Sequence, residues 1–492
     1  MELKKIKDIN QKIYELDNKI NRNSKMMFIS TLIFCCLNKD FKNPAKLNEV
    51  INIMGSLNPI DDLIELAKSE LKNIKLLDKT LSDVEYSLNI ISGSNTKLAE
   101  KRPDLKEFIN DFVCNVFPLL SDNDNLFLET LYMEIDKKAK NSDKGITLTP
   151  AYAAQLMIDL ADLDYKVDVV ADLSSGTGLF SLLAYSKMLN DLNIDKKNNK
   201  INEQDYTKYK IRLFNSIIAN DNDEKMVTLC LANFIIKELN TGLIYSNDIF
   251  NLSKSDFSYF DSNNNKVNLK PTKAILNPPY EDEYKPMEIV LKNIELLKGN
   301  SSNGKVIAIL PASKFGQNRV TFYNILINAT LKNVIKMQSD LFSESGQSPS
   351  TCIFEFDLSK EHRKNDLIHY YDFSDSGFVY LKDSGMVDKN NTHQQKKDEL
   401  FKKMREVKSD VYSSFVRTWN NFYEVSGETE LIAKIDPDIV KINKDEADVS
   451  FENITIKKML REKDELIKSV NNSFVDSDGE FEKYIVDILS EE

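Results

Sequence analysis

The chain has 492 residues, of which 41% are hydrophobic and 29% are charged, and its formal net charge is −12. This composition is typical of a globular protein with about three domains, and no apolar run reaches the roughly 18 residues that a membrane-spanning helix needs. A protein that holds DNA by itself usually has a basic surface, because neutralisation of phosphates dominates its affinity. We therefore expect a cytoplasmic protein without membrane contact, in which any nucleic-acid role needs a local basic face or a partner.

The chain has five cysteines and three histidines, and neither set has the spacing of a metal site. No two cysteines form a C-x-x-C pair, and their apolar neighbourhoods predict buried free thiols. The histidines lie together in a later region, at His362, His369 and His393. We expect no metal, and chemistry that runs without histidine.

The first 140 residues are predicted to form a helical N-terminal domain. Apolar residues recur at steps of three and four, at Ile6, Ile9, Ile13, Leu16 and Ile20, which indicates one apolar helix face. Later segments such as "LKEFINDFVCNVFPLL" continue the helical pattern.

Between residues 141 and 390, short β-rich runs such as "VDVVADL", "FNSIIAN" and "KVIAIL" alternate with helical segments. This alternation predicts an α/β domain with a mixed, mostly parallel sheet that helices cover on both faces. Two insertions rich in Asn, Lys and Asp, 190–210 and 252–270, are predicted to be exposed loops. Residues 391–492 are predicted to be a helical C-terminal region that docks a partner.

In "VDVVADLSSGTGLF" an apolar strand ends at Asp172, and a turn with Gly176 and Gly178 leads into a helix near Leu179. Only 14 of the 492 residues are glycine, so two within three residues indicate a backbone that turns sharply or approaches a ligand closely. A strand, a glycine turn and a helix are the usual nucleotide site of a doubly wound sheet. The dinucleotide fingerprint and the phosphate loop are both missing. The alternative is an ordinary strand–helix turn.

Two more acids follow the next predicted strands. Asp221 stands where a second strand ends and could bind ribose hydroxyls. Its alternative role is a helix N-cap, which Asp223 could also provide. Asp248 follows a third short run and could accept from the adenine amino group of a cofactor, or be an ordinary turn residue.

The tetrapeptide Asn277-Pro278-Pro279-Tyr280 follows a fourth predicted strand. Each proline fixes φ and holds the residue before it extended. The Asn277 side-chain oxygen and the Pro278 carbonyl can accept both hydrogens of a planar amino group, and Tyr280 can stack on the attached ring. Such acceptors favour the positive charge that develops when the nitrogen attacks a methyl group, without a titrating base. The methyl donor would be S-adenosylmethionine, held in the glycine turn; the alternative is a rigid proline loop.

Three acids come directly after this tetrapeptide, at Glu281, Asp282 and Glu283. We expect a solvated turn whose carboxylates cap the helix that begins near Met287. The alternative is that they face a DNA groove and repel DNA until a basic partner is present.

With these motifs the chain resembles the amino-methyltransferases, most closely the modification subunits of type I restriction–modification systems, over roughly residues 10 to 385. "TLTPAYAAQLMIDL" and "DLSSGTGLF" are similar to that family's segments around the cofactor, and Asn233 keeps the family's spacing from the ribose-binding acid. The chain departs from the family pattern at Leu173 and Ser175, and in Ala219-Asn220-Asp221. The resemblance and the motifs together imply cofactor contacts from Thr149, Pro150, Asp172, Ser174, Gly176, Gly178, Phe180, Asp221 and Asp248.

The resemblance implies methylation of adenine N6 in double-stranded DNA, on a base that is flipped out of the duplex. It also implies a separate specificity subunit, since too few residues follow the catalytic domain for a two-part recognition module. It leaves open whether a restriction nuclease subunit joins them. Two alternatives stay open. One is a methyltransferase that acts on RNA or protein glutamine through the same tetrapeptide, and the other is an inactive, cofactor-binding assembly subunit.

Overall fold

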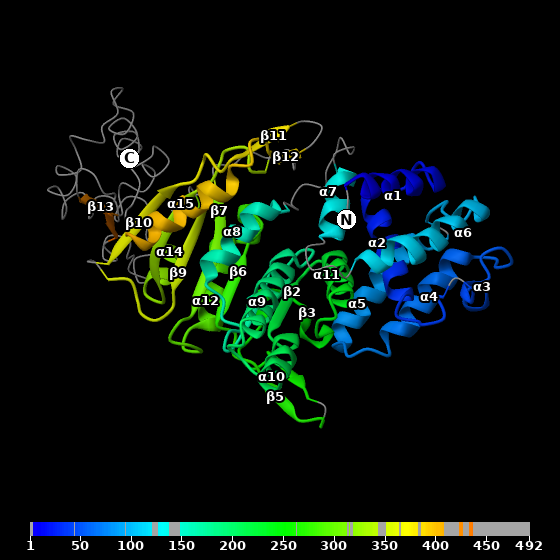
Figure 1. Cartoon of the computed structure of the whole chain (residues 1–492), viewed down its shortest axis with the longest axis horizontal. Coiled ribbons are helices and arrows are strands. Elements are labelled where there is room, and N and C mark those ends of the chain that lie inside the picture. The colour runs from blue at the N-terminus through cyan, green and yellow to red at the C-terminus, as the bar shows by residue number, and fades with distance from the viewer. Residues whose placement is uncertain are drawn as a thin grey trace, which may run out of the picture. The chain divides into compact units, whose positions relative to one another are not determined.

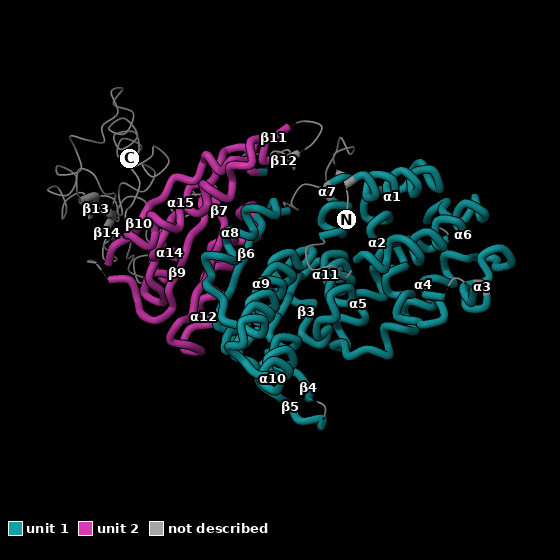
Figure 2. Tube along the Cα trace, in the orientation of Figure 1, with its two compact units in different colours: residues 1–279, 342–347 teal, residues 280–341, 348–492 magenta. Residues whose placement is uncertain are grey.

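The structure is a computed structural model that divides into two compact units, which Figure 2 colours separately. The first unit comprises Met1–Pro279 and Phe342–Gln347, and the second comprises Tyr280–Leu341 and Ser348–Glu492. The compact units divide the chain at other positions than the predicted domain boundaries, 140 and 390. Those boundaries stay a prediction. The structure describes residues 3–407 apart from 44, 94, 121–125, 137–147, 262, 312–313, 315–317, 343–350, 364–365 and 382–384, together with 423–426 and 432–435.

The N-terminal part of the first unit is helical. Helix α2 is buried on all sides from Ser24 to Cys35, as expected for a helix at the centre of a bundle. Asn21 caps it by accepting a hydrogen bond from the Ser24 amide. The elements are α1 (Leu3–Leu16), α2 (Arg22–Cys35), α3 (Leu47–Val50), α4 (Pro59–Leu71), α5 (Asp78–Leu88), α6 (Arg102–Asp111) and α7 (Phe127–Asp136), with the short helical turns η1 (Asn89–Ile91), η2 (Phe112–Val116) and η3 (Phe117–Leu119).

Four parallel strands of the first unit lie in the order β6-β1-β2-β3 (Figure 1). Their residues are buried almost throughout, which explains the continuous apolar runs in the sequence. Helix α9 packs on β1 and β2, and α11 packs on β2 and β3 and on α2 and α5 of the helical region. The elements are β1 (Val170–Asp172), β2 (Ile217–Asp221), β3 (Ile244–Ser246) and β6 (Lys273–Leu276), with α8 (Ala151–Ala161), α9 (Leu179–Lys197), α10 (Glu203–Phe214) and α11 (Glu224–Ile236).

The insertions at 190–210 and 252–270 are largely exposed as predicted, but both contain regular structure where only loops were expected. The first insertion holds the end of α9 and the first part of α10, whose N-cap Asn202 accepts from the Asp205 amide. The second holds an antiparallel hairpin of β4 (Ser258–Phe260) and β5 (Lys266–Asn268). Both insertions are polar because their elements are largely exposed, so composition alone did not distinguish them from loops.

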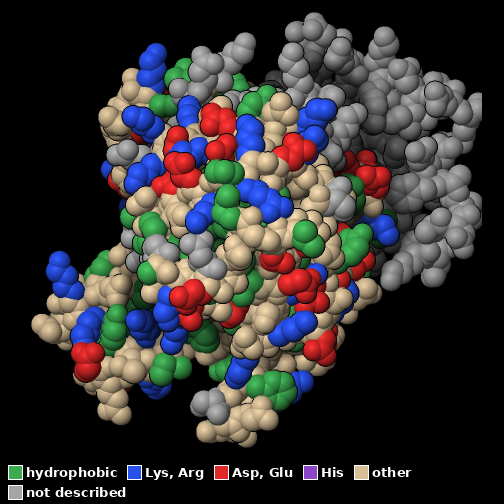
Figure 3. Space-filling model, turned by 90° about the vertical axis from the view of Figure 1, so that its right-hand side faces the viewer, with side chains coloured by type: hydrophobic (Ala, Val, Ile, Leu, Met, Phe, Trp, Pro, Cys, Tyr) green, Lys and Arg blue, Asp and Glu red, His purple; other side chains and the backbone are tan. Residues whose placement is uncertain are grey.

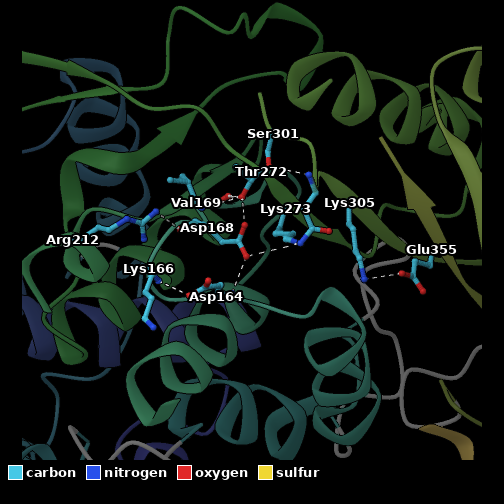
Figure 4. A network of polar contacts seen from close by, with 11 residues as sticks. Asp164, Lys166, Asp168, Val169, Arg212, Thr272, Lys273, Ser301, Lys305 and Glu355 are labelled. Atoms are coloured by element: carbon cyan, nitrogen blue, oxygen red, sulfur yellow. Dashed lines mark hydrogen bonds and ion pairs between the residues drawn. The ribbon is translucent and has the colours of Figure 1, made fainter. Parts of the chain in front are cut away.

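Buried polar residues connect β1 and β6 at the amino ends of these strands (Figure 4). The Asp168 carboxylate accepts from the Thr272 hydroxyl at 2.7 Å and from the Asp164 amide at 2.8 Å, and the fully buried Lys273 amine lies 4.0 Å from it. Arg212 donates to the Asp168 carbonyl. A buried ion pair is costly unless hydrogen bonds complete it. This network therefore fixes the alignment of β1 and β6 at their amino ends. The predicted site residues lie at the opposite edge of the sheet, where the strands have their carboxyl ends.

The second unit contributes a mixed set of strands. Strand β9 lies between β7 and β8 and is antiparallel to both, and β10 pairs parallel with β8. The elements are β7 (Lys305–Pro311), β8 (Thr330–Lys336), β9 (Thr351–Asp357), β10 (Leu367–Asp372), β11 (Phe378–Leu381) and β12 (Gly385–Asp388), with η6 (Asp282–Tyr284), α12 (Pro286–Leu297), α14 (Arg319–Leu326) and α15 (His393–Arg405).

Within residues 391–492 the structure describes helix α15 and two strands, β13 (Tyr423–Ser426) and β14 (Ile432–Ile435). The prediction of helices is wrong for these two segments, because β14 adds to the edge of β10 and β13 pairs with β14, both antiparallel. The predicted helix "ITIKKMLREKDELIKSV" lies outside the described residues. In the described part of the chain, no helix has both the length and the hydrophobicity to cross a membrane.

Candidate active site

Four side chains predicted for the site follow the carboxyl ends of the four parallel strands. Asp172 and Asp221 are the last residues of β1 and β2, Asn277 comes directly after β6, and Asp248 comes two residues after β3. Because the strands are parallel, all four positions lie at the same edge of the sheet. The sheet thus brings together the residues that the sequence pattern singled out.

The two glycines of the turn after β1 have different surroundings. Both have positive φ, +52° at Gly176 and +88° at Gly178, which side chains rarely adopt. A Cβ at Gly178 would lie 3.0 Å from the Cys230 sulfur, so this glycine lets α11 pack closely against the turn. A Cβ at Gly176 would meet nothing within 4 Å. Gly176 therefore borders open space, which a ligand could fill.

Asp221 holds this turn from the neighbouring strand. Its carboxylate accepts from the Gly176 amide at 2.8 Å and from the Asp223 amide at 3.0 Å, and burial raises its pKa. Asp223 is the N-cap of α11 and accepts from the Lys225 amide at 2.8 Å, so the capping alternative for Asp221 does not apply. Each carboxylate oxygen can accept more than one hydrogen bond. The half-buried Asp221 can thus bind the turn and a hydroxyl at once.

Asp172 is fully buried and is hydrogen-bonded to the first turn of α9. Its carboxylate accepts from the Ser181 hydroxyl at 3.2 Å and from the Ser181 amide at 3.3 Å. Burial raises the pKa of Asp172 to about 8, against the lowering effect of the Ser181 hydrogen bonds. Asp172 thus fixes the first turn of α9, and a contact to a cofactor stays a prediction for it.

Asn220, where the chain departs from the family pattern, also fixes the turn. Its buried side chain donates to the Leu173 carbonyl at 3.2 Å, and its own carbonyl accepts from the Ser175 amide at 2.9 Å. Ser174 is half-buried, and its hydroxyl oxygen has no hydrogen-bond partner among the described residues. Sequence analysis gave Asn220 no role, since its function depends on the register between β1 and β2.

Asn277 is held by the segment that precedes α8. Its side-chain amide nitrogen donates to the Thr149 hydroxyl at 2.9 Å, and Thr149 is 7% exposed. Pro150, also buried, follows Thr149 and precedes the first residue of α8. Because the amide nitrogen faces Thr149, the carboxamide oxygen lies on the other branch of the planar group. Thr149, predicted to contact the cofactor, is thus found to orient Asn277.

The other residues of the tetrapeptide are also largely enclosed. Pro278 is buried, Pro279 is half-buried, and Tyr280 is 8% exposed. Burial raises the pKa of the Tyr280 phenol well above its usual value, so the ring is neutral. Pro279 is the last residue of this segment in the first compact unit, and Tyr280 begins the second.

Phe180 and Asp248 occupy different environments. Phe180 is 4% exposed and packs in the first turn of α9. Asp248 is exposed, and its carboxylate accepts from the Phe250 amide at 3.0 Å at the start of η5 (Ile249–Asn251). This is the bond of a turn aspartate, and a contact to a cofactor stays a prediction for both residues.

The acids after Tyr280 do not cap α12 as predicted. This helix begins at Pro286, and its N-cap Lys285 has a left-handed backbone with φ of 52° and no side-chain capping bond. Asp282 instead pairs with the Lys314 amine at 2.6 Å. The left-handed residue turns the chain between η6 and α12.

The geometry favours a nucleoside ligand at the glycine turn. Open space over Gly176 and a half-buried carboxylate at Asp221 offer room and a polar partner for a ribose, and the buried Ser174 hydroxyl lies in the same turn. Among the described residues, no group of three or more His, Cys, Asp or Glu side chains could hold a metal ion.

Comparison with known proteins gives the same fold. No family model matches the chain. A crystal structure of a protein described as the modification subunit of a type I restriction enzyme from Vibrio vulnificus superposes with a TM-score of 0.55 and 14% identity, over 90% of this chain and 97% of the other. The chain has the fold of a type I modification subunit. A chain from a study of complex assembly in a type I restriction–modification system superposes equally well, with a TM-score of 0.55, 13% identity, and 82% and 83% of the two chains covered.

A curated relative supports the resemblance at the level of sequence. The chain is 26% identical over 328 residues to the type II restriction enzyme and methyltransferase RM.BcgI of Heyndrickxia coagulans. The match covers 64% of this chain and 47% of that protein, so it spans about half the relative's length. The predicted fold class and the resemblance to restriction–modification methyltransferases are therefore confirmed.

Proposed function

We propose that the chain transfers a methyl group from S-adenosylmethionine to the N6 amino group of a flipped adenine in DNA, as the modification subunit of a restriction–modification system. The observation that carries this proposal is the orientation of Asn277. Its amide nitrogen donates to Thr149, so the carboxamide oxygen lies on the opposite branch of the planar group and is the atom that would accept from an amino group. The relative and the structural neighbours described above support the same class of reaction.

The residues of the glycine turn fit the proposed cofactor. Asp221 would accept from the ribose hydroxyls, Gly176 would leave room for the ligand, and Ser174 would supply a polar contact. Asp248, which is exposed at the same edge, would accept from the adenine amino group of the cofactor. When bound, the cofactor supplies an electrophilic methyl group on a sulfonium.

Asn277 and Pro278 would act on the target amino group. They accept its two hydrogens, so they stabilise the positive charge that appears on nitrogen as the new N–C bond forms and the C–S bond breaks. The extended backbone imposed by Pro278 and Pro279 fixes both acceptors before the base arrives. Tyr280, next in the chain, would stack on the base with its neutral ring. The surplus proton then leaves the methylated nitrogen for solvent.

DNA contact would depend on a partner. The net charge is −12, and on the face shown in Figure 3 basic and acidic side chains are interspersed without a continuous basic area among the described residues. A separate specificity subunit would supply target recognition and much of the phosphate contact, and a restriction nuclease subunit could join the same assembly. Transfer to RNA or protein glutamine, and an inactive assembly role, are the outcomes that the following test distinguishes.

The test is transfer of a tritiated methyl group from S-adenosylmethionine to DNA, RNA and cell protein, with and without the specificity subunit. We expect labelled DNA, and labelling of protein alone would contradict the proposal. Asn277→Ala should reduce transfer by about 100-fold or more while cofactor affinity survives. Asn215→Ala is a matched control, because Asn215 is half-buried and hydrogen-bonded but precedes β2 at the opposite edge. Equal transfer by wild type and Asn277→Ala would refute the proposed geometry.

A further inference from the structure

A buried carboxylate from the N-terminal helical region reaches the glycine turn. Glu129, on α7, is 7% exposed and accepts from the Asn233 side-chain nitrogen at 2.9 Å. The same nitrogen of Asn233 donates to the Thr177 carbonyl at 2.8 Å. Thr177 lies between Gly176 and Gly178, so the carboxylate, the amide and the turn form one continuous chain of hydrogen bonds.

Glu129 is hydrogen-bonded both to the glycine turn and to helix α11. The Thr177 side chain also hydrogen-bonds this carboxylate, and the positive charge of Lys237 lowers its pKa. Burial has the larger effect and raises the pKa of Glu129. Burying a carboxyl group is costly unless hydrogen bonds compensate, and an apolar residue of similar volume would fill the same space at lower cost. The position is therefore better explained by the contacts it makes than by packing.

We infer that Glu129 is a positioning residue, through which the helical region fixes the shape of the cofactor turn. Asn233 has two side-chain N–H groups and can satisfy the carboxylate and the carbonyl together only in one orientation. Glu129 specifies that orientation, and Asn233 then holds the Thr177 carbonyl and keeps the space over Gly176 open. The inference deepens the proposed function and rests on it in one respect: the ligand that occupies this space is taken to be S-adenosylmethionine.

This role links two parts of the chain that are far apart in sequence. Glu129 and Asn233 are separated by 104 residues, and α7 belongs to the region that was predicted to be helical and to precede the catalytic domain. Helix α7 also packs on α1 and α2. The helical region thus contributes directly to the cofactor site of the same compact unit, whichever partner it also docks.

The experiment compares Glu129→Met, Glu129→Gln and Asp17→Asn with wild type in the full chain. Methionine keeps the length without an acceptor, and glutamine keeps an acceptor oxygen. Asp17 is a matched control: it is 5% exposed and accepts from the Lys19 and Lys97 amides, both at 2.9 Å, within the helical region. Hydrogen exchange of the amides in 173–180 is measured without cofactor, and the Kd for S-adenosylmethionine is measured by calorimetry.

For Glu129→Met we expect exchange in 173–180 to be at least about tenfold faster and cofactor binding to be at least about tenfold weaker. The variant loses the bonds from both Asn233 and Thr177, and one bond to a charged group already implies about tenfold. Glu129→Gln and Asp17→Asn should stay within about twofold of wild type in both measurements. Unchanged exchange in Glu129→Met, or a uniform increase throughout the chain, would overturn the inference. If wild type itself fails to bind S-adenosylmethionine, the proposed function fails, and the exchange data alone decide the role of Glu129.

Discussion

The bond between Thr149 and Asn277 allows the proposed acceptor geometry to be tested without touching the acceptor. Thr149→Val keeps the shape of the side chain and removes the hydroxyl that receives the Asn277 amide nitrogen at 2.9 Å. A neutral hydrogen bond of this kind contributes about 0.5–1.5 kcal/mol. Its loss lets the amide rotate and present its nitrogen to the target, where two donors would face each other. We therefore expect kcat to fall by about 2- to 13-fold, the rate equivalent of that energy.

The assay is single-turnover transfer of tritiated methyl to DNA in the presence of the proposed specificity subunit, together with the Kd for S-adenosylmethionine. Thr149→Ser keeps the hydroxyl and should transfer within about twofold of wild type. If Thr149 acts through Asn277, Thr149→Val lowers the rate and leaves the Kd unchanged. If Thr149 instead lines the methionine end of the cofactor, as the resemblance implies, the Kd rises.

A double-mutant cycle gives the sharper result. Adding Thr149→Val to Asn277→Ala should cause no further loss of rate, because the hydroxyl then has no amide to orient. Equal losses in the two backgrounds would refute the argument that Thr149 works through Asn277. A wild-type rate in Thr149→Val alone would refute it as well.

Two further predictions concern the turn after β1. Gly178→Ala should lower the free energy of unfolding by about 2–4 kcal/mol, since the φ of this residue is +88° and a Cβ would lie 3.0 Å from the Cys230 sulfur. In chemical denaturation, adding Cys230→Ala should recover only part of this loss, because the strained φ remains. Wild-type stability of Gly178→Ala would contradict the reasoning. Because burial raises the pKa of Asp172 to about 8, the folded chain keeps a proton that the unfolded chain releases above about pH 4, so this group's contribution to stability falls as the pH rises to about 8. The Tm of Asp172→Asn relative to wild type should therefore rise between about pH 5 and pH 8, and a constant difference would show that Asp172 does not titrate in this way.

The positions of the strand ends could be predicted from the sequence because they depend on local patterns. The apolar runs before Asp172, Asp221 and Asn277 are strands that the structure places side by side. Parallel pairing then brings their carboxyl ends to one edge without any information about side chains. The prolines after Asn277 likewise restrict only the backbone next to them, so their effect can be predicted from the tetrapeptide alone.

The contacts that complete the site were not predictable, because each joins residues far apart in the chain. Thr149 and Asn277 are 128 residues apart, and Glu129 and Asn233 are 104 apart. No periodicity or spacing reports such a pairing. The errors at 190–210 and 252–270 have a different cause, since exposed helices and hairpins share the polar composition of loops.

The burial of the site residues separates two roles that the sequence motif combines. Gly178, Asp172 and Asn220 are buried, and they bind α11, α9 and the turn backbone respectively. Gly176, Asp221 and Asn277 are only half-buried, and each has a main-chain or side-chain bond that fixes it while part of its surface stays accessible.

A methyl transfer that uses no titrating base depends on acceptors that are already in place when the substrate arrives. The buried residues at this edge supply that rigidity, and the half-buried ones supply the contacts. A substitution in the first set should therefore change stability together with affinity, whereas removal of the Asn277 side chain should change the rate alone.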